Sequence, residues 1–166
     1  MAVNQSLPSR PERASDNRLF LRDEELADGV RLVLAAAGAL DALLAEPLAA
    51  EGLSRSQGDV LMALERTPGI DVAGLRRQLS MTVPTLARLL GQLDAKGLID
   101  RTHSSSRDAR RRALRLTPAG VAAAERLSTP LRQRLKSAYR AAGPQEVAGL
   151  RTVLAALTGA DGAHEA

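Results

Sequence analysis

The sequence predicts a mostly α-helical protein with one small β-hairpin, and three observations lead to this fold class. The chain has 166 residues, 45% of them hydrophobic, but only Phe20 and Tyr139 are aromatic. An aliphatic core of this kind favours helices over sheets. Apolar residues recur at spacings of three and four in three long segments, which is typical of amphipathic helices. Between Leu98 and Thr117, two short strand-like runs flank a polar, basic tip, which indicates a hairpin.

The N-terminal part of the chain divides into two segments. Residues 1–22 contain Pro8 and Pro11 and show no helical periodicity, so we expect a flexible arm. The next segment carries one apolar stripe and is predicted to form a helix that ends near Pro47. The stripe consists of Leu26, Val30, Val33, Ala37, Leu40 and Leu44. Because such a stripe needs a partner helix, residues 23–50 are predicted to serve dimerisation.

Three short helices are predicted in the middle of the chain. Each starts at a residue whose side chain caps its first turn: Ser54, which forms a capping box with Gln57, then Asp71, then Thr82. The three helices are expected to end at Thr67-Pro68-Gly69, at Leu79 and at Lys96-Gly97. Followed by the hairpin, this order of elements predicts a winged helix-turn-helix over residues 53–117.

Two further amphipathic helices are predicted after the hairpin. Thr117 and Pro118 suit the N-cap and the first turn of one of them, and Pro130 is expected to kink it. Its apolar stripe consists of Ala124, Leu127, Leu131, Leu135 and Ala138. The other follows Gly143-Pro144, and its stripe consists of Val147, Leu150, Leu154 and Leu157.

The helical stripes bracket the central region from both sides. Residues 118–160 are predicted to be C-terminal dimerisation helices, with a tail at 161–166. Together with residues 23–50 they are expected to form an intermolecular bundle, and the protein is expected to be a homodimer. Packing of the stripes within one chain is the alternative.

The hairpin carries a concentrated positive charge. Between Arg101 and Arg115, six arginines accompany one acidic residue, Asp108. The formal net charge of the chain is +4, and residues 52–117 alone hold 12 basic against 6 acidic residues. A polyanion is therefore the expected partner. A solvated loop with incidental charge is the alternative.

The composition excludes several kinds of site. Without cysteine the chain has no disulfide, thiol redox sensor or cysteine-based zinc site, and His103 and His164 lie far apart, so no metal and no cofactor are expected. The scarcity of aromatic residues argues against platforms that stack single-stranded bases. The longest apolar run, Leu32–Leu40, is too short to cross a bilayer and no signal core precedes it. A cytoplasmic protein without membrane contact is expected.

An enzyme built on this chain would have to use His103, Ser104–Ser106 and Asp108, which superficially form a nucleophile set. All of them lie on the expected hairpin tip, which offers no buried base and no oxyanion site. We therefore expect no enzymatic activity.

The third central helix divides into two faces. Its apolar face consists of Leu86, Leu89, Leu90 and Leu93, and its other face of Thr82, Val83, Thr85, Ala87, Arg88, Gly91 and Gln92. A face of small and polar residues can enter a major groove. There Arg88 could fork to guanine, Thr85 could donate to a base edge or a phosphate, and Gln92 could pair with adenine or touch the backbone. The rival roles are a bridge from Arg88 to Asp94 or to a phosphate, and service of the first-turn amides by Thr85.

Several short motifs occur together between residues 53 and 120. They are Leu53-Ser54, Gln57, Leu79-Ser80, the Leu86–Leu93 helix, Lys96-Gly97-Leu98-Ile99-Asp100-Arg101, Asp108-Ala109-Arg110 and Leu116-Thr117-Pro118-Ala119-Gly120. With these motifs the chain resembles the MarR (multiple antibiotic resistance regulator) family over about residues 23–160. The wing spacing is the most specific part of the likeness.

The resemblance implies a homodimer with a recognition helix in each major groove of double-stranded DNA and a wing tip in each flanking minor groove. It also implies that Asp108 orients Arg110 or Arg111 toward the narrow groove. The DNA-binding residues expected on this basis are Thr82, Thr85, Arg88, Gln92, Arg107, Asp108, Arg110 and Arg111. Ala87 and Gly91-Gln92 replace residues that are polar or charged in many members, which shifts weight from the helix to the wing.

We therefore predict a sequence-specific, double-stranded-DNA-binding transcriptional regulator. It is expected to act as a homodimeric repressor on a near-palindromic operator, and the resemblance implies release by a small organic effector that binds between the winged domain and the dimer interface. The alternative is a winged-helix protein-interaction module without specific DNA binding.

Overall fold

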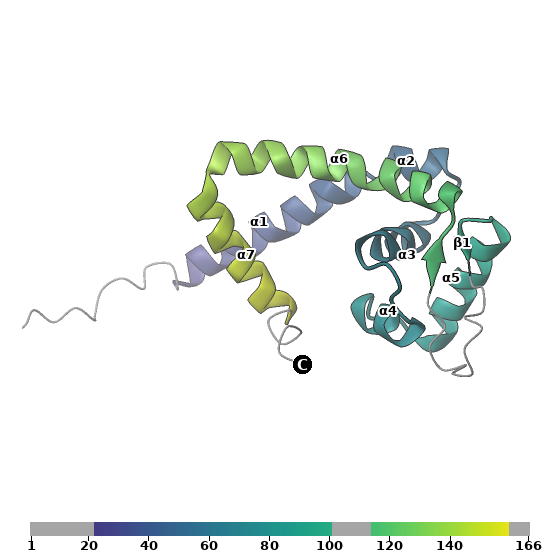
Figure 1. Cartoon of the computed structure of the whole chain (residues 1–166). Helices are drawn as coiled ribbons and strands as arrows, with labels where there is room; N and C mark the ends of the chain where they lie inside the picture. The colour runs from purple at the N-terminus through teal and green to yellow at the C-terminus, as the bar shows by residue number, and fades with distance from the viewer. Residues whose placement is uncertain (1–21, 101–113, 160–166) are drawn as a thin grey trace, which may run out of the picture. The chain divides into compact units, whose positions relative to one another are not determined.

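The computed structural model of the chain describes residues 22–100 and 114–159 (Figure 1). Over these residues it contains, in chain order, α1 (Asp23–Ala42), α2 (Ala45–Ala50), α3 (Arg55–Arg66), α4 (Val72–Gln78), α5 (Val83–Ala95), β1 (Ile99–Asp100), β2 (Arg115–Leu116), α6 (Pro118–Ala142) and α7 (Pro144–Thr158). The predicted fold class, mostly helical with one small hairpin, is confirmed. The predicted arm, except for Arg22, and the tail at 161–166 lie outside the described residues.

The predicted helix starts in the central region are confirmed. The Ser54 side chain accepts a hydrogen bond from the backbone N–H of Gln57, and the Gln57 side chain accepts one from the backbone N–H of Ser54, so both halves of the capping box of α3 are present. Asp71 caps α4 by accepting from the N–H of Gly74. Thr82 caps α5 by accepting from the N–H of Thr85. Each cap satisfies an amide that has no partner within its own helix.

The first apolar segment forms two helices instead of one. The chain consists of two compact units, one up to Ala39 and one from Leu40 onward, so α1 belongs mainly to the first and α2 to the second. The expectation of one helix that ends near Pro47 is wrong, because α1 ends at Ala42 and Pro47 lies inside α2. Pro47 is the third residue of α2, where a helix needs no donor from its backbone nitrogen.

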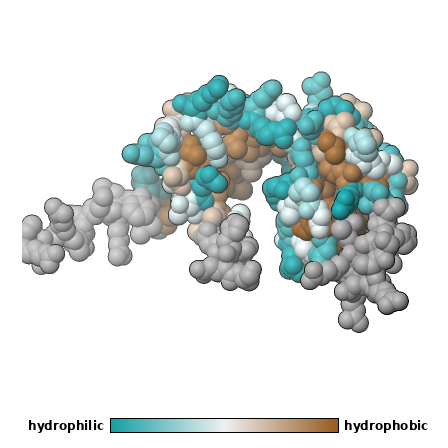
Figure 2. All heavy atoms as spheres, viewed as in Figure 1, coloured by the Kyte–Doolittle hydropathy of each residue, from teal (hydrophilic) through white to brown (hydrophobic). Residues whose placement is uncertain are grey.

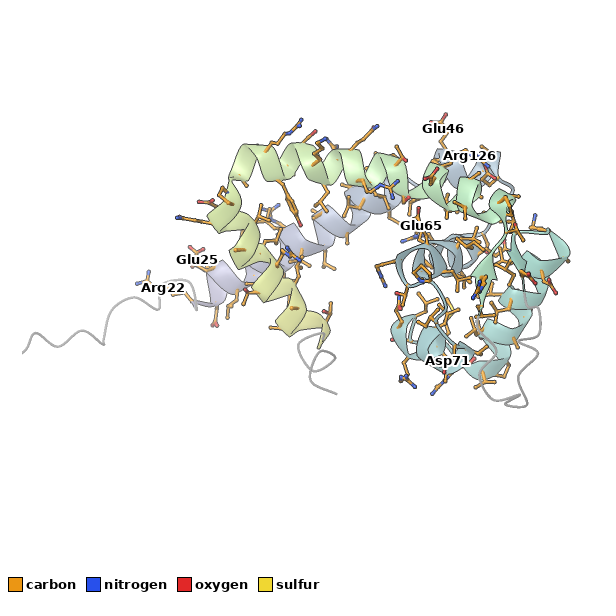
Figure 3. All side chains as sticks on the ribbon, viewed as in Figure 1. Arg22, Glu25, Glu46, Glu65, Asp71 and Arg126 are labelled. Atoms are coloured by element: carbon orange, nitrogen blue, oxygen red, sulfur yellow. The ribbon has the colours of Figure 1, made fainter. Side chains whose placement is uncertain are left out.

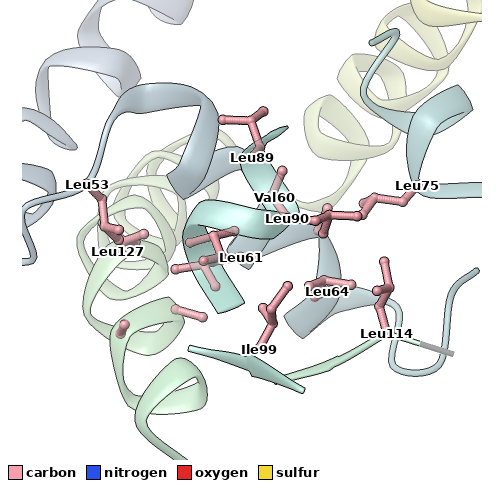
Figure 4. Close-up of a cluster of buried hydrophobic side chains, with 14 of the residues drawn as sticks. Leu53, Val60, Leu61, Leu64, Leu75, Leu89, Leu90, Ile99, Leu114 and Leu127 are labelled. Atoms are coloured by element: carbon pink, nitrogen blue, oxygen red, sulfur yellow. The ribbon is translucent and has the colours of Figure 1, made fainter. Parts of the chain in front are cut away.

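The core of the second unit is aliphatic and centres on α3 (Figure 4). Val60, Leu61 and Leu64 of α3 are buried, and Leu75 of α4 and Ile99 of β1 pack in the same cluster. The other buried hydrophobic residues of this cluster are Leu44, Leu48, Leu53, Ala63, Leu86, Leu89, Leu90, Leu93, Leu114, Ala123, Ala124 and Leu127. The winged core therefore extends beyond Thr117 into the first half of α6.

The hairpin base is short and closely tied to α3 and α6. Strands β1 and β2 pair antiparallel, with Ile99 opposite Leu116. The N–H of Leu114, just before β2, donates to the carbonyl oxygen of Ile70 at 3.3 Å. Leu114 itself is buried, so the chain returns from the hairpin tip into the core before α6 begins.

Thr117 joins the residues that follow α5 to the start of α6. Its hydroxyl donates to the carbonyl oxygen of Gly97 at 2.6 Å and accepts from the N–H of Gly120 at 3.0 Å. Its own N–H donates to the carbonyl oxygen of Leu98 at 3.1 Å. Gly97 has a φ of +67°, in the left-handed region that suits a glycine at the end of a helix. One threonine therefore holds α5, the hairpin base and α6 together.

We expect Thr117→Val to lower the free energy of unfolding by about 1–2 kcal/mol, because it removes the helix cap and the bond to Gly97 together. Thr117→Ser retains the hydroxyl and is the matched control, with an expected stability close to that of the native protein. Urea unfolding monitored by circular dichroism measures both. Equal stability of the Val and Ser variants would contradict the assigned role of the hydroxyl.

Large apolar side chains remain exposed on the terminal helices. Neither α1 nor α7 contains a buried residue, and Figure 2 shows hydrophobic side chains at the surface of the molecule. The exposed large hydrophobic residues on these two helices are Leu26, Val30, Leu32, Val33, Leu34, Leu150, Val153, Leu154 and Leu157. In α6 all buried residues lie between Gly120 and Ser128, and the helix continues through Pro130 to Ala142. The apolar stripes of α1 and α7 are therefore exposed and available to pack against another protein surface.

One apolar segment is long enough to cross a membrane by length and composition alone. It spans Asp23–Ala50, which covers α1, α2 and the turn between them and extends on both sides of the uninterrupted run Leu32–Leu40. A single helix of this kind is weak evidence, since the core helices of soluble proteins meet the same criteria.

Candidate nucleic-acid interface

The helices α4 and α5 form a helix-turn-helix unit with a tight connection. The turn contains Ser80, whose φ of +50° is unusual for a residue other than glycine. The N–H groups of Ser80 and Met81 donate to the carbonyl oxygens of Arg77 and Arg76, at 3.2 and 3.1 Å. These bonds close the end of α4 and set where α5 starts.

Helix α5 has one buried and one exposed face. Leu86, Leu89, Leu90 and Leu93 are buried in the core. On the other face Thr82, Val83, Ala87, Arg88 and Gln92 are exposed, and Thr85 and Gly91 are half-buried. The predicted division of this helix is therefore confirmed. Its exposed face brings together four candidates for DNA contact, namely Thr82, Thr85, Arg88 and Gln92.

The two threonines at the start of α5 are linked to each other. Their hydroxyl oxygens lie 2.8 Å apart, and the Thr82 hydroxyl also accepts from the N–H of Thr85 at 3.4 Å. The Thr82 hydroxyl therefore bonds the first-turn amide of Thr85. The alternative role of the Thr85 side chain, bonding the first-turn amides itself, is not observed in the described contacts. Both hydroxyls lie at the helix N-terminus, where the positive end of the helix dipole favours an anion such as a DNA phosphate.

Arg88 and Gln92 are neighbours one turn apart on α5. A terminal nitrogen of Arg88, Nη1, donates to the side-chain oxygen Oε1 of Gln92 at 3.3 Å. The same oxygen accepts from Nε2 of Gln57, on α3, at 3.1 Å. Within the described part of the chain, no carboxylate lies within ion-pair distance of Arg88, so a bridge to Asp94 does not form.

Sequence reasoning placed Gln57 in the capping box and among the family motifs, and gave it no part in the exposed face of the third central helix. The signal for a second role is its residue type: glutamate also completes such a box, but glutamine adds an NH₂ group that can donate elsewhere. Arg76 and Arg77 were also missed. They are exposed in the last turn of α4, the helix that crosses the DNA backbone in helix-turn-helix proteins.

The hairpin tip lies outside the described residues. This range, 101–113, contains four of the predicted DNA-binding residues, namely Arg107, Asp108, Arg110 and Arg111, and also His103 and Ser104–Ser106. Of the six hairpin arginines only Arg115 is described, and it is exposed on β2.

Two acidic residues near the starts of the central elements, Glu51 after α2 and Asp59 on α3, form ion pairs with arginines. Arg126 of α6 forms a two-bond ion pair with Glu51, the longer bond measuring 3.1 Å, and its hydrogen bond lowers the pKa of that carboxyl below its usual value. Burial raises the pKa of Asp59, although Arg55 lies 2.7 Å away. Figure 3 labels Arg126 on α6 beside α2, and Glu65 on α3. The Arg126–Glu51 pair joins α6 to the end of α2, whereas the Arg55–Asp59 pair lies within α3.

A cavity of about 560 Å³ lies where α3, β2 and the first half of α6 meet. Its walls combine apolar and charged side chains, among them Leu64, Leu116, Val121, Glu65, Arg115 and Glu125. It has the size of a small-molecule pocket. Among the residues that the structure describes, no group of three or more His, Cys, Asp and Glu side chains could hold a metal ion.

Comparison with known proteins points to one family. A sequence profile of the MarR family matches residues 51–111. The chain is 37% identical over 139 residues to the HTH-type transcriptional regulator PetP of Rhodobacter capsulatus, which covers 84% of this chain and 83% of PetP. A MarR family regulator from Silicibacter pomeroyi has a similar structure, with a TM-score of 0.63 at 30% identity, covering 80% of this chain and 90% of that one. The S. aureus MepR–DNA complex gives a TM-score of 0.63 at 20% identity, covering 79% of this chain and 96% of MepR.

Proposed function

Because the chain belongs to the MarR family of transcriptional regulators, we propose that it binds a near-palindromic operator in double-stranded DNA as a homodimer and represses transcription there. The observation that carries this proposal is the exposed face of α5. It presents Arg88, two threonine hydroxyls and the Gln92 amide on a helix whose other face is anchored by four buried leucines. Such a helix can enter a major groove without disturbing the core.

Each candidate residue has a proposed task. Arg88 contacts a base edge, and Thr82 and Thr85 bind a phosphate or a base edge at the start of α5. In the hairpin tip, Asp108 orients Arg110 or Arg111 toward the adjacent minor groove, and Arg107 adds to the phosphate contacts. Arg76 and Arg77 at the end of α4 are further candidates for phosphate contacts.

The proposed dimer buries the exposed apolar surface of the terminal helices. Residues 23–50 and 118–160 supply this interface. The support is the row of exposed leucines and valines on α1 and α7, since exposed apolar patches of this kind mark interaction sites. A regulator of this kind acts where the DNA is, and we place it in the cytoplasm without membrane contact.

We expect selection of bound duplexes from a genomic library to recover an inverted repeat whose half-sites lie roughly 10 bp apart, one turn on one face of the DNA. Titration of the best site should show an affinity that falls by about 10³-fold or more between 50 and 200 mM salt, because phosphate contacts release counterions. Equal affinity for selected and scrambled duplexes at physiological salt would contradict sequence-specific regulation. That result would favour the alternative, a protein-interaction module.

We propose that a small organic effector binds in the cavity between α3, β2 and α6 and lowers the affinity for DNA. The chain has no cysteine for redox sensing, and the cavity walls combine apolar side chains with the charged Arg115, Glu65 and Glu125. A thermal shift screen of phenolic and aliphatic acids should find a compound that stabilises the dimer. At a ligand concentration of 100 times its Kd, the free energy of unfolding should rise by about 2.7 kcal/mol. A screen in which only divalent metals stabilise the protein would contradict the proposal.

A further inference from the structure

The three side chains Gln57, Gln92 and Arg88 form a hydrogen-bonded chain that runs from the N-terminus of α3 to the exposed face of α5. We infer that Gln57, acting through Gln92, positions Arg88 for contact with a guanine in each operator half-site. Gln57 is a positioning residue in this inference, because it is buried, with 7% of its surface exposed. The inference rests on the proposed function, in which α5 reads DNA.

The orientation of the two side-chain amides, of Gln57 and Gln92, follows because the groups at each end of the chain, the Ser54 N–H and the Arg88 guanidinium, can only donate. The backbone N–H of Ser54 donates to Oε1 of Gln57 at 2.8 Å, so the NH₂ group of Gln57 must point away from the cap. That group faces Gln92, which must therefore present its oxygen. Arg88 can only donate, and it meets the same oxygen. Each of these contacts requires the same amide orientation.

This arrangement determines what Gln92 and Arg88 can offer to DNA. A bidentate contact with adenine needs both the oxygen and the nitrogen of a glutamine amide. The Gln92 oxygen already accepts two hydrogen bonds, one for each lone pair, so only its NH₂ group remains. Arg88 uses Nη1 for Gln92, and its Nε and Nη2 donors stay available as a pair. Such a pair matches O6 and N7 of guanine.

The hydrogen bond to Gln92 also explains how Arg88, a long and exposed side chain, can recognise a base. An arginine loses rotamer freedom when it binds, and a hydrogen bond that already restricts the side chain lowers that loss. The fixed end of this hydrogen-bonded chain is Gln57, which is buried on α3 and bonded to the backbone N–H of Ser54. The orientation of Arg88 is therefore connected to a rigid element.

The test compares guanine preference among variants of the full-length dimer. The informative base position is the one at which Arg88→Ala abolishes the preference for guanine over adenine. We expect the native protein to prefer guanine there by about 10-fold to 100-fold. The critical variant is Gln57→Glu, because glutamate keeps the capping box but removes the donor to Gln92. We expect it to reduce the preference at least about 5-fold, toward that of Arg88→Ala.

The ratio of the affinity for the guanine duplex to the affinity for the adenine duplex separates a loss of Arg88 positioning from effects that weaken binding to every duplex. The added charge of Gln57→Glu weakens binding to every duplex and cancels in the ratio. In an Arg88→Ala background, Gln57→Glu should leave the ratio unchanged. Gln92→Ala should lower it, and Gln92→Glu should preserve it, since a carboxylate still accepts from both Gln57 and Arg88. The two Gln92 variants also decide the matter if Gln57→Glu does not fold.

Three results would overturn the inference. They are an unchanged guanine preference in Gln57→Glu or in Gln92→Ala, a further loss when Gln57→Glu is added to Arg88→Ala, and a native operator with no position that depends on Arg88. Failure of the native protein to bind any sequence specifically is a different result. It would overturn the proposed function, and with it this inference.

Discussion

Gly120→Ala is expected to destabilise the winged domain by about 3 kcal/mol or more, the largest effect expected for an alanine at any glycine that the structure describes. The added Cβ would overlap the carbonyl oxygen of Leu98 and lie 2.9 Å from its carbonyl carbon. Both are backbone atoms, so no side-chain rotation relieves the clash. The same carbonyl accepts the hydrogen bond from the N–H of Thr117. Relief of the clash therefore requires α6 to move away from the hairpin base.

The matched control for this substitution is Gly149→Ala. Gly149 lies in the middle of α7, and nothing lies within 4 Å of the position that its Cβ would take. Because alanine favours a helix over glycine, the control should be neutral or stabilising by up to about 1 kcal/mol. Thermal unfolding at one fixed protein concentration compares the two variants. A Gly120→Ala protein as stable as the native one would contradict the close approach of α6 to Leu98.

The double variant Arg110→Ala, Arg111→Ala is expected to lower the affinity for the selected operator by at least about 100-fold at 0.15 M salt. Six arginines and one aspartate between Arg101 and Arg115 make this segment the most basic part of the chain. Two arginines that contact phosphates or the minor groove contribute about two units to the slope of log affinity against log salt concentration. The slope should therefore fall by about two.

A charge-matched control is the double variant Arg134→Ala, Arg151→Ala, which removes two exposed arginines from α6 and α7. It lowers the net charge by the same amount at positions outside the proposed DNA interface. We expect it to change operator affinity less than about 5-fold. Size-exclusion chromatography should give the same assembly for both variants. Loss of affinity in the control alone, or in both variants equally, would contradict a DNA-binding role specific to the wing.

The features that the sequence predicted correctly depend on neighbouring residues. The caps at Ser54, Asp71, Thr82 and Thr117 each join a side chain to an amide three residues later, and such a spacing is visible in a sequence. The division of α5 into two faces likewise follows from the repeat of its leucines. Local rules suffice for these features because every partner lies within one or two turns.

What sequence reasoning missed depends on contacts between distant segments. The stripe of α1 and α2 looks continuous in sequence, but Leu44 and Leu48 turn into the core of the second unit while Leu26 and Val30 stay exposed. The second bond of Gln57 reaches Gln92, 35 positions later. The task of Gly120 depends on Leu98, on the other side of the hairpin. No periodic pattern carries this information.

The Thr117 contacts bear on how a signal could reach DNA. Because the Thr117 hydroxyl joins Gly97, just after α5, to the start of α6, and a Cβ at Gly120 would overlap Leu98, we expect α5 and the start of α6 to move together. A ligand that shifts α6 therefore carries the whole of α5 with it and does not deform its surface. In a dimer such a shift changes the separation and the tilt of the two α5 helices. We expect regulation to alter how well both halves fit one duplex at the same time, while the base preference of each half stays constant.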